Sequence, residues 1–204
     1  VPQGATGLLG PNGAGKSTFL KTILGLIQTT EGEGTVLGLD IRTQGDEIRS
    51  RIGYMPEYDA LNPEMEAIHQ VRYSGELLGM NPTIALARAH ETLQYVGLGE
   101  QRYRNIGSYS TGMKQATKLA CALIHDPELI IAYEPSNGLD IAARDYMIET
   151  LTNTVQSGNR SVLMASHLMD DVERVCDNFI LLHKGKLAAQ GRIEDLKAFD
   201  REIE

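Results

Sequence analysis

Short apolar runs alternate along the chain with stretches in which apolar residues recur every three or four positions. Phe19, Leu20, Ile23, Leu24 and Ile27 form one such helical stripe. The short runs predict strands at 5–9, 35–37, 52–55, 129–133 and 161–165, and a hairpin of 179–182 with 186–189. The stripes predict helices at 16–27, 46–51, 66–80, 82–96 and 141–156, with others after 110 and at 168–176. This alternation favours an α/β fold with a mainly parallel sheet.

The middle of the chain, 56–124, has helical stripes but no strong strand pattern. A length of 204 residues corresponds to one domain. We therefore expect one domain in which 1–55 and 125–190 form the α/β core. We also expect 56–124 to be an inserted helical subdomain and 191–204 a helical tail.

Composition narrows the class of protein. Hydrophobic residues make up 42% and charged residues 23%, which is ordinary for a folded soluble domain. The net charge of −8 argues against a nucleic-acid partner. Cys121 and Cys176 lie far apart with no CxxC pair, so neither a disulfide framework nor a structural zinc site is expected. No apolar run is long enough to cross a bilayer, and the first residues lack a signal peptide's pattern, so any membrane role should require a partner.

A glycine-rich loop follows the first predicted strand and precedes the first predicted helix. Gly10-Pro-Asn-Gly-Ala-Gly-Lys16-Ser17-Thr18 fits the P-loop pattern GxxxxGK[ST], in which backbone N–H groups and a lysine hold the phosphates of a nucleotide. Ser17 offers a hydroxyl to Mg²⁺. The alternative is a turn that only joins strand to helix. The candidate nucleotide-binding residues are Asn12, Gly13, Ala14, Gly15, Lys16, Ser17 and Thr18.

Four more segments follow in order: Tyr54-Met-Pro-Glu57, Tyr109-Ser-Thr-Gly-Met-Lys-Gln115, Leu129-Ile-Ile-Ala-Tyr-Glu-Pro-Ser-Asn-Gly-Leu-Asp140 and Ala165-Ser-His167. With these segments and the P-loop, nearly the whole chain resembles the ATP-binding subunit of ABC transporters, especially the exporter-type subgroup. The resemblance implies a P-loop NTPase (RecA-like) core, ATP and Mg²⁺ as cofactors, and a homo- or heterodimer with another ABC ATPase subunit. It also implies a separate transmembrane permease and a place on the cytoplasmic face of the plasma membrane.

Three roles in catalysis follow from the resemblance. Lys16 holds the phosphates, Glu134 polarises the attacking water, and His167 contacts the γ-phosphate and orients that water. A solvated loop glutamate and a satisfied core histidine are the alternatives for Glu134 and His167.

Other roles concern the dimer and the metal. Ser110 and Gly112 face the nucleotide held by the partner subunit, and Asp140 lies at the dimer junction. As lone residues, Ser110 and Asp140 could instead cap the helices that follow them. Glu57 joins Ser17 as a metal ligand, although the family usually has glutamine there.

The clearest departure from the family is Tyr133, which stands where the family has an aspartate that holds Mg²⁺. A phenol is neutral near pH 7 and is a poor ligand for a hard cation. Slow hydrolysis is therefore expected. The resemblance also implies strands before Val1, with an aromatic residue that stacks on adenine; these strands are absent from the sequence. The alternative functions are a binding-only ABC module and a soluble ABC ATPase outside transport.

Overall fold

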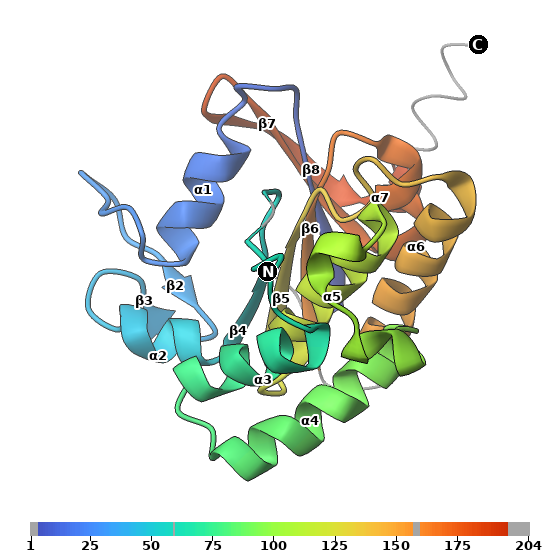
Figure 1. The fold of residues 1–204 in the computed structure, drawn as a ribbon. Helices are drawn as coiled ribbons and strands as arrows, with labels where there is room; N and C mark the ends of the chain where they lie inside the picture. The colour runs from blue at the N-terminus through green and yellow to red at the C-terminus, as the bar shows by residue number, and fades with distance from the viewer. Residues whose placement is uncertain (1–3, 59, 157–159, 196–204) are drawn as a thin grey trace.

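A six-stranded sheet forms the centre of the computed structural model, which describes residues 4–58, 60–156 and 160–195 (Figure 1). The strand order is β4-β5-β6-β1-β7-β8, and every neighbouring pair is parallel except β7 with β8. The parallel sheet expected from the alternation is thus confirmed. The strands are β1 (Ala5–Leu9), β4 (Ile52–Met55), β5 (Leu129–Tyr133), β6 (Ser161–Ala165), β7 (Asn178–His183) and β8 (Lys186–Arg192).

The register places the ends of three strands side by side. Ala165, the last residue of β6, lies opposite Leu8 of β1 and opposite Tyr133 of β5. Because these strands are parallel, the loops that follow them all leave the same edge of the sheet. Ligands of open α/β sheets bind at such an edge, outside the carboxyl ends of the strands.

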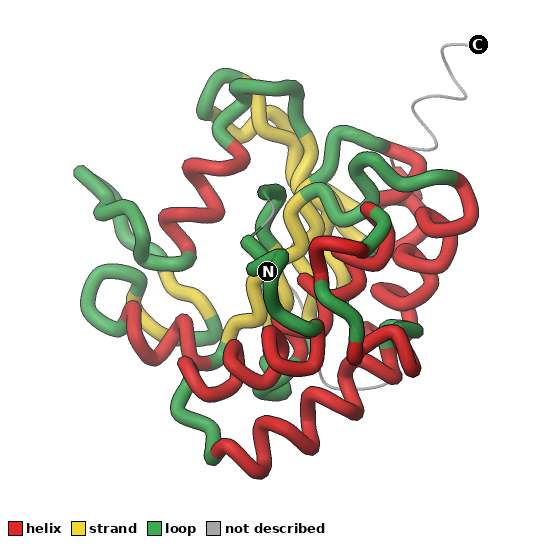
Figure 2. The backbone as a smooth tube through the Cα atoms, in the orientation of Figure 1, coloured by secondary structure: helices red, strands yellow, loops and turns green. Residues whose placement is uncertain are grey.

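Helices cover both faces of the sheet, in two separate hydrophobic cores. One core contains Leu20 of α1 (Lys16–Ile23) and Ile48 of α2 (Gly45–Ser50). The other includes residues of α5 (Thr111–Leu123), α6 (Ile141–Gln156) and α7 (Met169–Val175). Figures 1 and 2 show α1 and α2 on one side of the strands and α5, α6 and α7 on the other.

Side-chain alternation along β5 divides its residues between these cores. Leu129, Ile131 and Tyr133 pack on the α1 side, while Ile130 and Ala132 pack on the opposite side. The tyrosine at the end of the strand is therefore directed toward the face that carries the phosphate loop's helix.

The helical block contains α3 (Ala67–Leu77), α4 (Pro82–Tyr95), the 3₁₀ turns η1 (Gly99–Tyr103) and η2 (Ile106–Ser108), and α5. The Asn81 side chain accepts a hydrogen bond from the N–H of Thr83 at 2.9 Å, and Pro82 opens the helix. Helix α5 packs against α3, α4 and β4, so it joins the helical block to the sheet.

Helix α3 ends at Leu77 rather than at 80, where Gly79 adopts φ 85°, and three further predicted boundaries were wrong. Leu37 is not in a strand: with Gly38 it forms a left-handed turn between β2 (Thr35–Val36) and β3 (Leu39–Asp40), an antiparallel pair that the apolar pattern missed. Helix α1 ends at Ile23 rather than at 27, because Gly25 adopts φ 67° and ends the helical path.

The third correction concerns the expected tail. Gly191 and Arg192 belong to β8, and 193–195 are helical. The rest of the expected tail, 196–204, lies outside the described residues. Among the described helices, none combines the length and apolar character needed to cross a membrane.

Candidate functional site

The glycine loop between β1 and α1 has a backbone path that requires glycine. Gly13 and Gly15 adopt φ values of 79° and 103°, in the left-handed region. A Cβ at Gly10, where φ is 152°, would lie 2.5 Å from the carbonyl oxygen of Leu182. The loop therefore turns sharply into the first N–H groups of α1, an arrangement suited to anions.

The Lys16 side chain folds back over this loop. Only 4% of Lys16 is exposed, and its Nζ donates to the Gly10 carbonyl at 2.5 Å and to that of Pro11 at 3.4 Å. Ala14 is buried, whereas Asn12, Gly13, Ser17 and Thr18 are exposed. The loop thus presents a positive charge, backbone donors and the Ser17 hydroxyl at one place.

The β7–β8 hairpin supports the loop. The N–H of Gly185, at the tip of the hairpin, donates to the carbonyl of Ala14 at 2.9 Å. A Cβ on Gly15 would come within 3.3 Å of the Gly185 Cα atom. The loop is thus packed closely against a second backbone segment.

Glu134 lies directly after β5 and is almost completely buried. It has a left-handed φ of 47°, its N–H donates to the Ala165 carbonyl at 2.7 Å, and 4% of the residue is exposed. Its Oε2 atom accepts from Ser166 Oγ at 3.2 Å and lies 2.8 Å from His167 Nδ1. These partners offset the cost of burying a carboxylate.

Two of the predicted catalytic residues are therefore brought together. Glu134 and His167 come from the ends of adjacent strands, and 49% of the histidine side chain is exposed. Neither residue matches its alternative description: the glutamate is not solvated, and the histidine is not enclosed in the core. A strained, buried carboxylate paired with an accessible imidazole is the arrangement expected of groups that handle a water molecule.

Tyr133 contacts the phosphate loop directly. Its ring packs in the α1-side core, 9% of the residue is exposed, and its hydroxyl lies 2.8 Å from Ser17 Oγ. The sequence indicates a bulky side chain at this position, but it does not indicate that the hydroxyl reaches the loop.

The residues expected to face a second subunit form a separate group at the surface. Ser110 caps α5, because its Oγ accepts from the Met113 N–H at 3.3 Å. Asp140 caps α6 in the same way, accepting from the Ala143 N–H at 2.9 Å. Gly112 fits against Ala143, where a Cβ would approach to 3.1 Å. Within the described residues, no hydrogen bond links this group to Lys16 or its loop.

Comparison with known proteins agrees with this geometry. A family model described as "ABC transporter" matches residues 1–137. The chain belongs to the ABC transporter ATP-binding family. Its fold, a P-loop ABC ATPase with a mostly parallel sheet and helical parts, is the one expected from the sequence. Members of this family bind ATP, typically with Mg²⁺.

The chain is similar to named ATP-binding proteins of resistance and export systems. It is 38% identical over 190 residues to the linearmycin resistance ATP-binding protein LnrL of Bacillus subtilis, covering 93% of this chain and 61% of LnrL. It is 35% identical over 190 residues to the Nod factor export ATP-binding protein I of Cupriavidus pinatubonensis, covering 93% of this chain and 58% of that protein. The chain thus spans about three fifths of the length of these relatives.

A solved structure supports the fold. The dimeric, post-hydrolysis ATP-binding cassette MJ0796, described as bound to ADP and Pi, superposes with a TM-score of 0.83 at 24% identity. The match covers 94% of this chain and 86% of that one.

Ser17 and Glu57 are the residues of this ABC chain that would hold the metal that family members typically use, and Tyr133 is the residue that does not fit it. Ser17 Oγ is engaged by a neutral phenol, and the Glu134 carboxylate by Ser166 and His167. Among the described residues, no hydrogen bond joins Ser17 to Glu57, and no group of three or more His, Cys, Asp or Glu side chains could hold a metal. Mg²⁺ in nucleotide sites usually takes one or two carboxylates besides phosphate oxygens.

Glu57 lies on a loop that is held by a side chain of α5. The buried Lys118 of α5 donates through Nζ to the carbonyls of Pro56 and Glu57, at 2.9 and 3.1 Å. Burial raises the pKa of Tyr54, and the nearby Tyr133 and Glu57 raise that pKa further. Both side chains therefore lie near Tyr54.

Three supporting residues were missed by sequence analysis. Ser166 holds Glu134 and also accepts from the N–H of Leu168 at 3.1 Å. Lys118 holds the Glu57 loop. Asp171 accepts from Ser136 Oγ and, at 2.6 Å, from Arg144 Nε. Of these three residues, only Ser166 had a signal in the sequence, because it stands between a predicted strand and a predicted helix.

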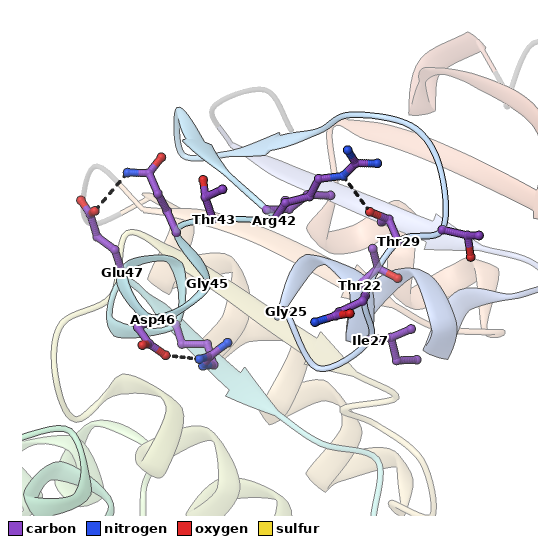
Figure 3. Close-up of a pocket in the computed structure, with 14 residues that line it drawn as sticks. Thr22, Gly25, Ile27, Thr29, Arg42, Thr43, Gly45, Asp46 and Glu47 are labelled. Atoms are coloured by element: carbon purple, nitrogen blue, oxygen red, sulfur yellow. Dashed lines mark hydrogen bonds and ion pairs between the residues drawn. The ribbon is translucent and has the colours of Figure 1, made fainter.

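Among the described residues, hollows also lie outside the phosphate site, and two of them are larger than about 300 Å³. One, of about 740 Å³, opens beside the carboxyl end of α1 (Figure 3). Polar groups line it, with Arg42 Nε donating to Thr29 Oγ1 at 3.2 Å, and none of the predicted site residues is among them. The other, of about 310 Å³, lies between the helical block and β4, and its lining includes Tyr54, Leu61 and Cys121.

Proposed function

We propose that this chain is the ATP-binding and ATP-hydrolysing subunit of an ABC exporter. The observation that carries the proposal is the meeting of the Lys16 loop, Glu134 and His167 at the carboxyl ends of β1, β5 and β6. A phosphate-binding loop beside a buried carboxylate and an accessible imidazole is suited to hydrolysis of a nucleoside triphosphate.

The geometry assigns each side chain a role in ATP hydrolysis. The loop N–H groups and the amino end of α1 bind the phosphates, and the Lys16 ammonium exchanges its carbonyl partners for phosphate oxygens. Glu134 Oε2 holds the attacking water and takes up its proton. His167, paired with the same oxygen, orients that water toward the terminal phosphate.

A second subunit would complete the site. Ser110 and Asp140 are exposed, as is Ile141, at 82%, so these residues are available to another copy or to a related subunit. The cap of α5 combines a hydroxyl, a glycine N–H and a helix amino end, which suits it to the terminal phosphate held by the partner. The dimeric description of the solved relative supports this arrangement.

A permease helix is the partner that we propose for the hollow of about 310 Å³. Tyr54, Leu61 and Leu78 line the hollow, and Tyr58 beside it is 80% exposed. The name of the Nod factor export relative supports the direction of transport. Binding to such a permease would hold this chain at the cytoplasmic face of the membrane.

The proposed function is tested by ATP turnover in the presence of magnesium, measured beside nucleotide binding on the same sample. We expect binding with slow turnover, because Tyr133 replaces a charged group near the phosphates. Tyr133→Asp should raise the rate about a hundredfold, the usual scale for one catalytic electrostatic group. Glu134→Gln should remove turnover while leaving binding intact. Equal rates for the folded wild type and Tyr133→Asp would contradict this explanation of slow turnover.

A second candidate is a binding-only ABC module, in which ATP joins two subunits without being consumed. The contact between Tyr133 and Ser17 favours it, because that contact occupies a hydroxyl that hydrolysis would use. Binding without measurable turnover would support this second function.

A further inference from the structure

A buried glutamine of α5 holds the loop that follows Glu134. Only 5% of Gln115 is exposed, and its Nε2 atom donates to the backbone carbonyl of Asn137 at 3.3 Å. Because a carbonyl can only accept, the nitrogen of the amide must face the loop. Gln115 is therefore a donor from α5 to the segment between β5 and α6.

The peptide that Gln115 holds belongs to the turn that carries Glu134. The N–H of Asn137 donates to the carbonyl of Glu134 at 3.2 Å, and the N–H of Glu134 donates to the Ala165 carbonyl at 2.7 Å. Glu134 also adopts a left-handed φ of 47°, which costs free energy in a residue other than glycine. Such a backbone persists only where its surroundings restrain it, and Gln115 supplies a restraint from α5.

The same loop is held on a second side as well. Within the loop, Ser136 donates to Asp171 of α7. The loop also packs closely on the first turn of α5, since a Cβ on Gly138 would lie 3.5 Å from Thr111 Cγ2. Loss of the Gln115 donor would therefore loosen the α5 side of the loop while its contact with α7 remains.

The other end of the Gln115 amide does not stabilise the fold. Among the described residues, its buried Oε1 atom has no hydrogen-bond partner. A buried polar atom without a partner lowers stability. An apolar side chain of similar length would avoid that cost and would lose only the bond to Asn137. The contribution of Gln115 therefore lies in the loop that it holds.

We propose that Gln115 is a positioning residue for hydrolysis, which acts through the Asn137 carbonyl to hold the strained backbone of Glu134 and so to aim its carboxylate at the attacking water. The inference rests on the proposed function, since it concerns the same carboxylate. Gln115 acts through another residue and is not itself catalytic.

Gln115→Met tests the proposal, because methionine has a similar length but cannot donate a hydrogen bond. ATP turnover is measured with this change in the wild type and in Tyr133→Asp. We expect kcat to fall about tenfold while KM stays within about twofold, because the carboxylate is misplaced and the phosphate loop is untouched. An unchanged kcat in both backgrounds would overturn the proposal.

Urea denaturation separates positioning from a merely structural role. We expect Gln115→Met to unfold at a urea concentration no lower than the wild type does, because the change removes the unpartnered Oε1 atom. A lower unfolding midpoint together with a lower kcat would assign Gln115 a structural role and would contradict the proposal.

Gln115→Glu adds a pH profile and serves as a second variant if Gln115→Met fails to fold. Its ionised carboxylate cannot donate to Asn137, whereas its protonated form can, and burial raises the pKa of a carboxyl group. The ratio of wild-type to variant kcat should therefore fall as the pH is lowered from about 8 to about 6. A ratio that does not change with pH would contradict the donor role.

Amide hydrogen exchange gives a readout that needs no turnover. In Gln115→Met, peptides that contain Asn137 should exchange about threefold to tenfold faster, the effect of one lost hydrogen bond, while peptides of α4 stay unchanged. Gln156→Met, the same change at an exposed glutamine of α6, is the matched control and should alter neither exchange nor turnover.

The outcomes distinguish this inference from the proposed function. Turnover that Gln115→Met leaves intact overturns the inference and leaves the proposed function standing. Absence of turnover in both the wild type and Tyr133→Asp overturns both. Unchanged exchange around Asn137 in Gln115→Met also contradicts the inference, whatever the rate of hydrolysis.

Discussion

The buried carboxylates among the described residues, Glu134 and Asp171, each accept hydrogen bonds from neighbouring side chains. Glu134 is held by Ser166 and His167, and the fully buried Asp171 by Ser136 and Arg144. Ser136 lies in the loop that leads from Glu134 to α6, while Asp171 belongs to α7, which follows His167. Asp171 thus ties together the two segments that carry the proposed catalytic pair.

Replacing Asp171 by alanine should lower the free energy of unfolding by about 3 kcal/mol, because the buried Ser136 hydroxyl loses its acceptor and Arg144 loses a charged hydrogen-bond partner. Urea denaturation measures this change. The control is Asp145→Ala, which removes a half-exposed ion pair with Arg174 and should change stability by less than about 1 kcal/mol. Equal losses of stability in the two variants would contradict the stabilising role of the buried Asp171 carboxylate.

Helix α5 carries one functional group at its amino end and another about two turns later. Its amino end presents Ser110 at the surface, and two turns later Lys118 holds the carbonyls of Pro56 and Glu57. Because the helix also packs on β4, it forms a rigid connection between the proposed dimer face and the Glu57 loop.

Lys118→Met should release the Glu57 loop while the helix stays folded, because methionine keeps the apolar stem of lysine but cannot donate. Amide hydrogen exchange should become faster in peptides that contain Glu57 and stay unchanged in α4. The control is Lys21→Met, the same change at an exposed lysine of α1, which should leave exchange around Glu57 unchanged. Unchanged amide exchange around Glu57 in Lys118→Met would contradict the proposal that Lys118 fixes the Glu57 loop.

At the scale of the whole molecule, no hydrogen bond among the described residues joins the phosphate loop to the α5 cap, so nothing in one copy closes the cap over the loop. We expect ATP to bring the two together between copies. A double variant with Asn12→Cys and Ser110→Cys should form intermolecular disulfides faster when ATP is present, and neither single variant should do so.

The natural thiols should not interfere with that measurement. Burial raises the pKa of Cys121 to about 11 and that of Cys176 to about 12, so few thiolates form near pH 7. An equal rate of disulfide formation with and without ATP would contradict ATP-driven pairing. Disulfide formation in the single variants would contradict it as well.

Sequence patterns predicted the parts of this structure that depend on local order. The short apolar run at 129–133 located β5, and the alternation of side chains along any strand places Tyr133 with Leu129 and Ile131 on the α1 side. The glycine pattern located the phosphate loop. By contrast, the bonds of Lys118 to Glu57 and of Ser136 to Asp171 join residues 61 and 35 positions apart, and no periodic signal records such pairs. The turn at Leu37 was missed because leucine rarely adopts a left-handed backbone.

The β7–β8 hairpin offers a way to observe the site from outside. Its tip residues are exposed, yet Gly185 is joined to Ala14 of the phosphate loop by a single hydrogen bond of 2.9 Å. A fluorophore attached at Lys184 would therefore sit next to the loop without entering it, and its emission would report when the loop rearranges around a ligand.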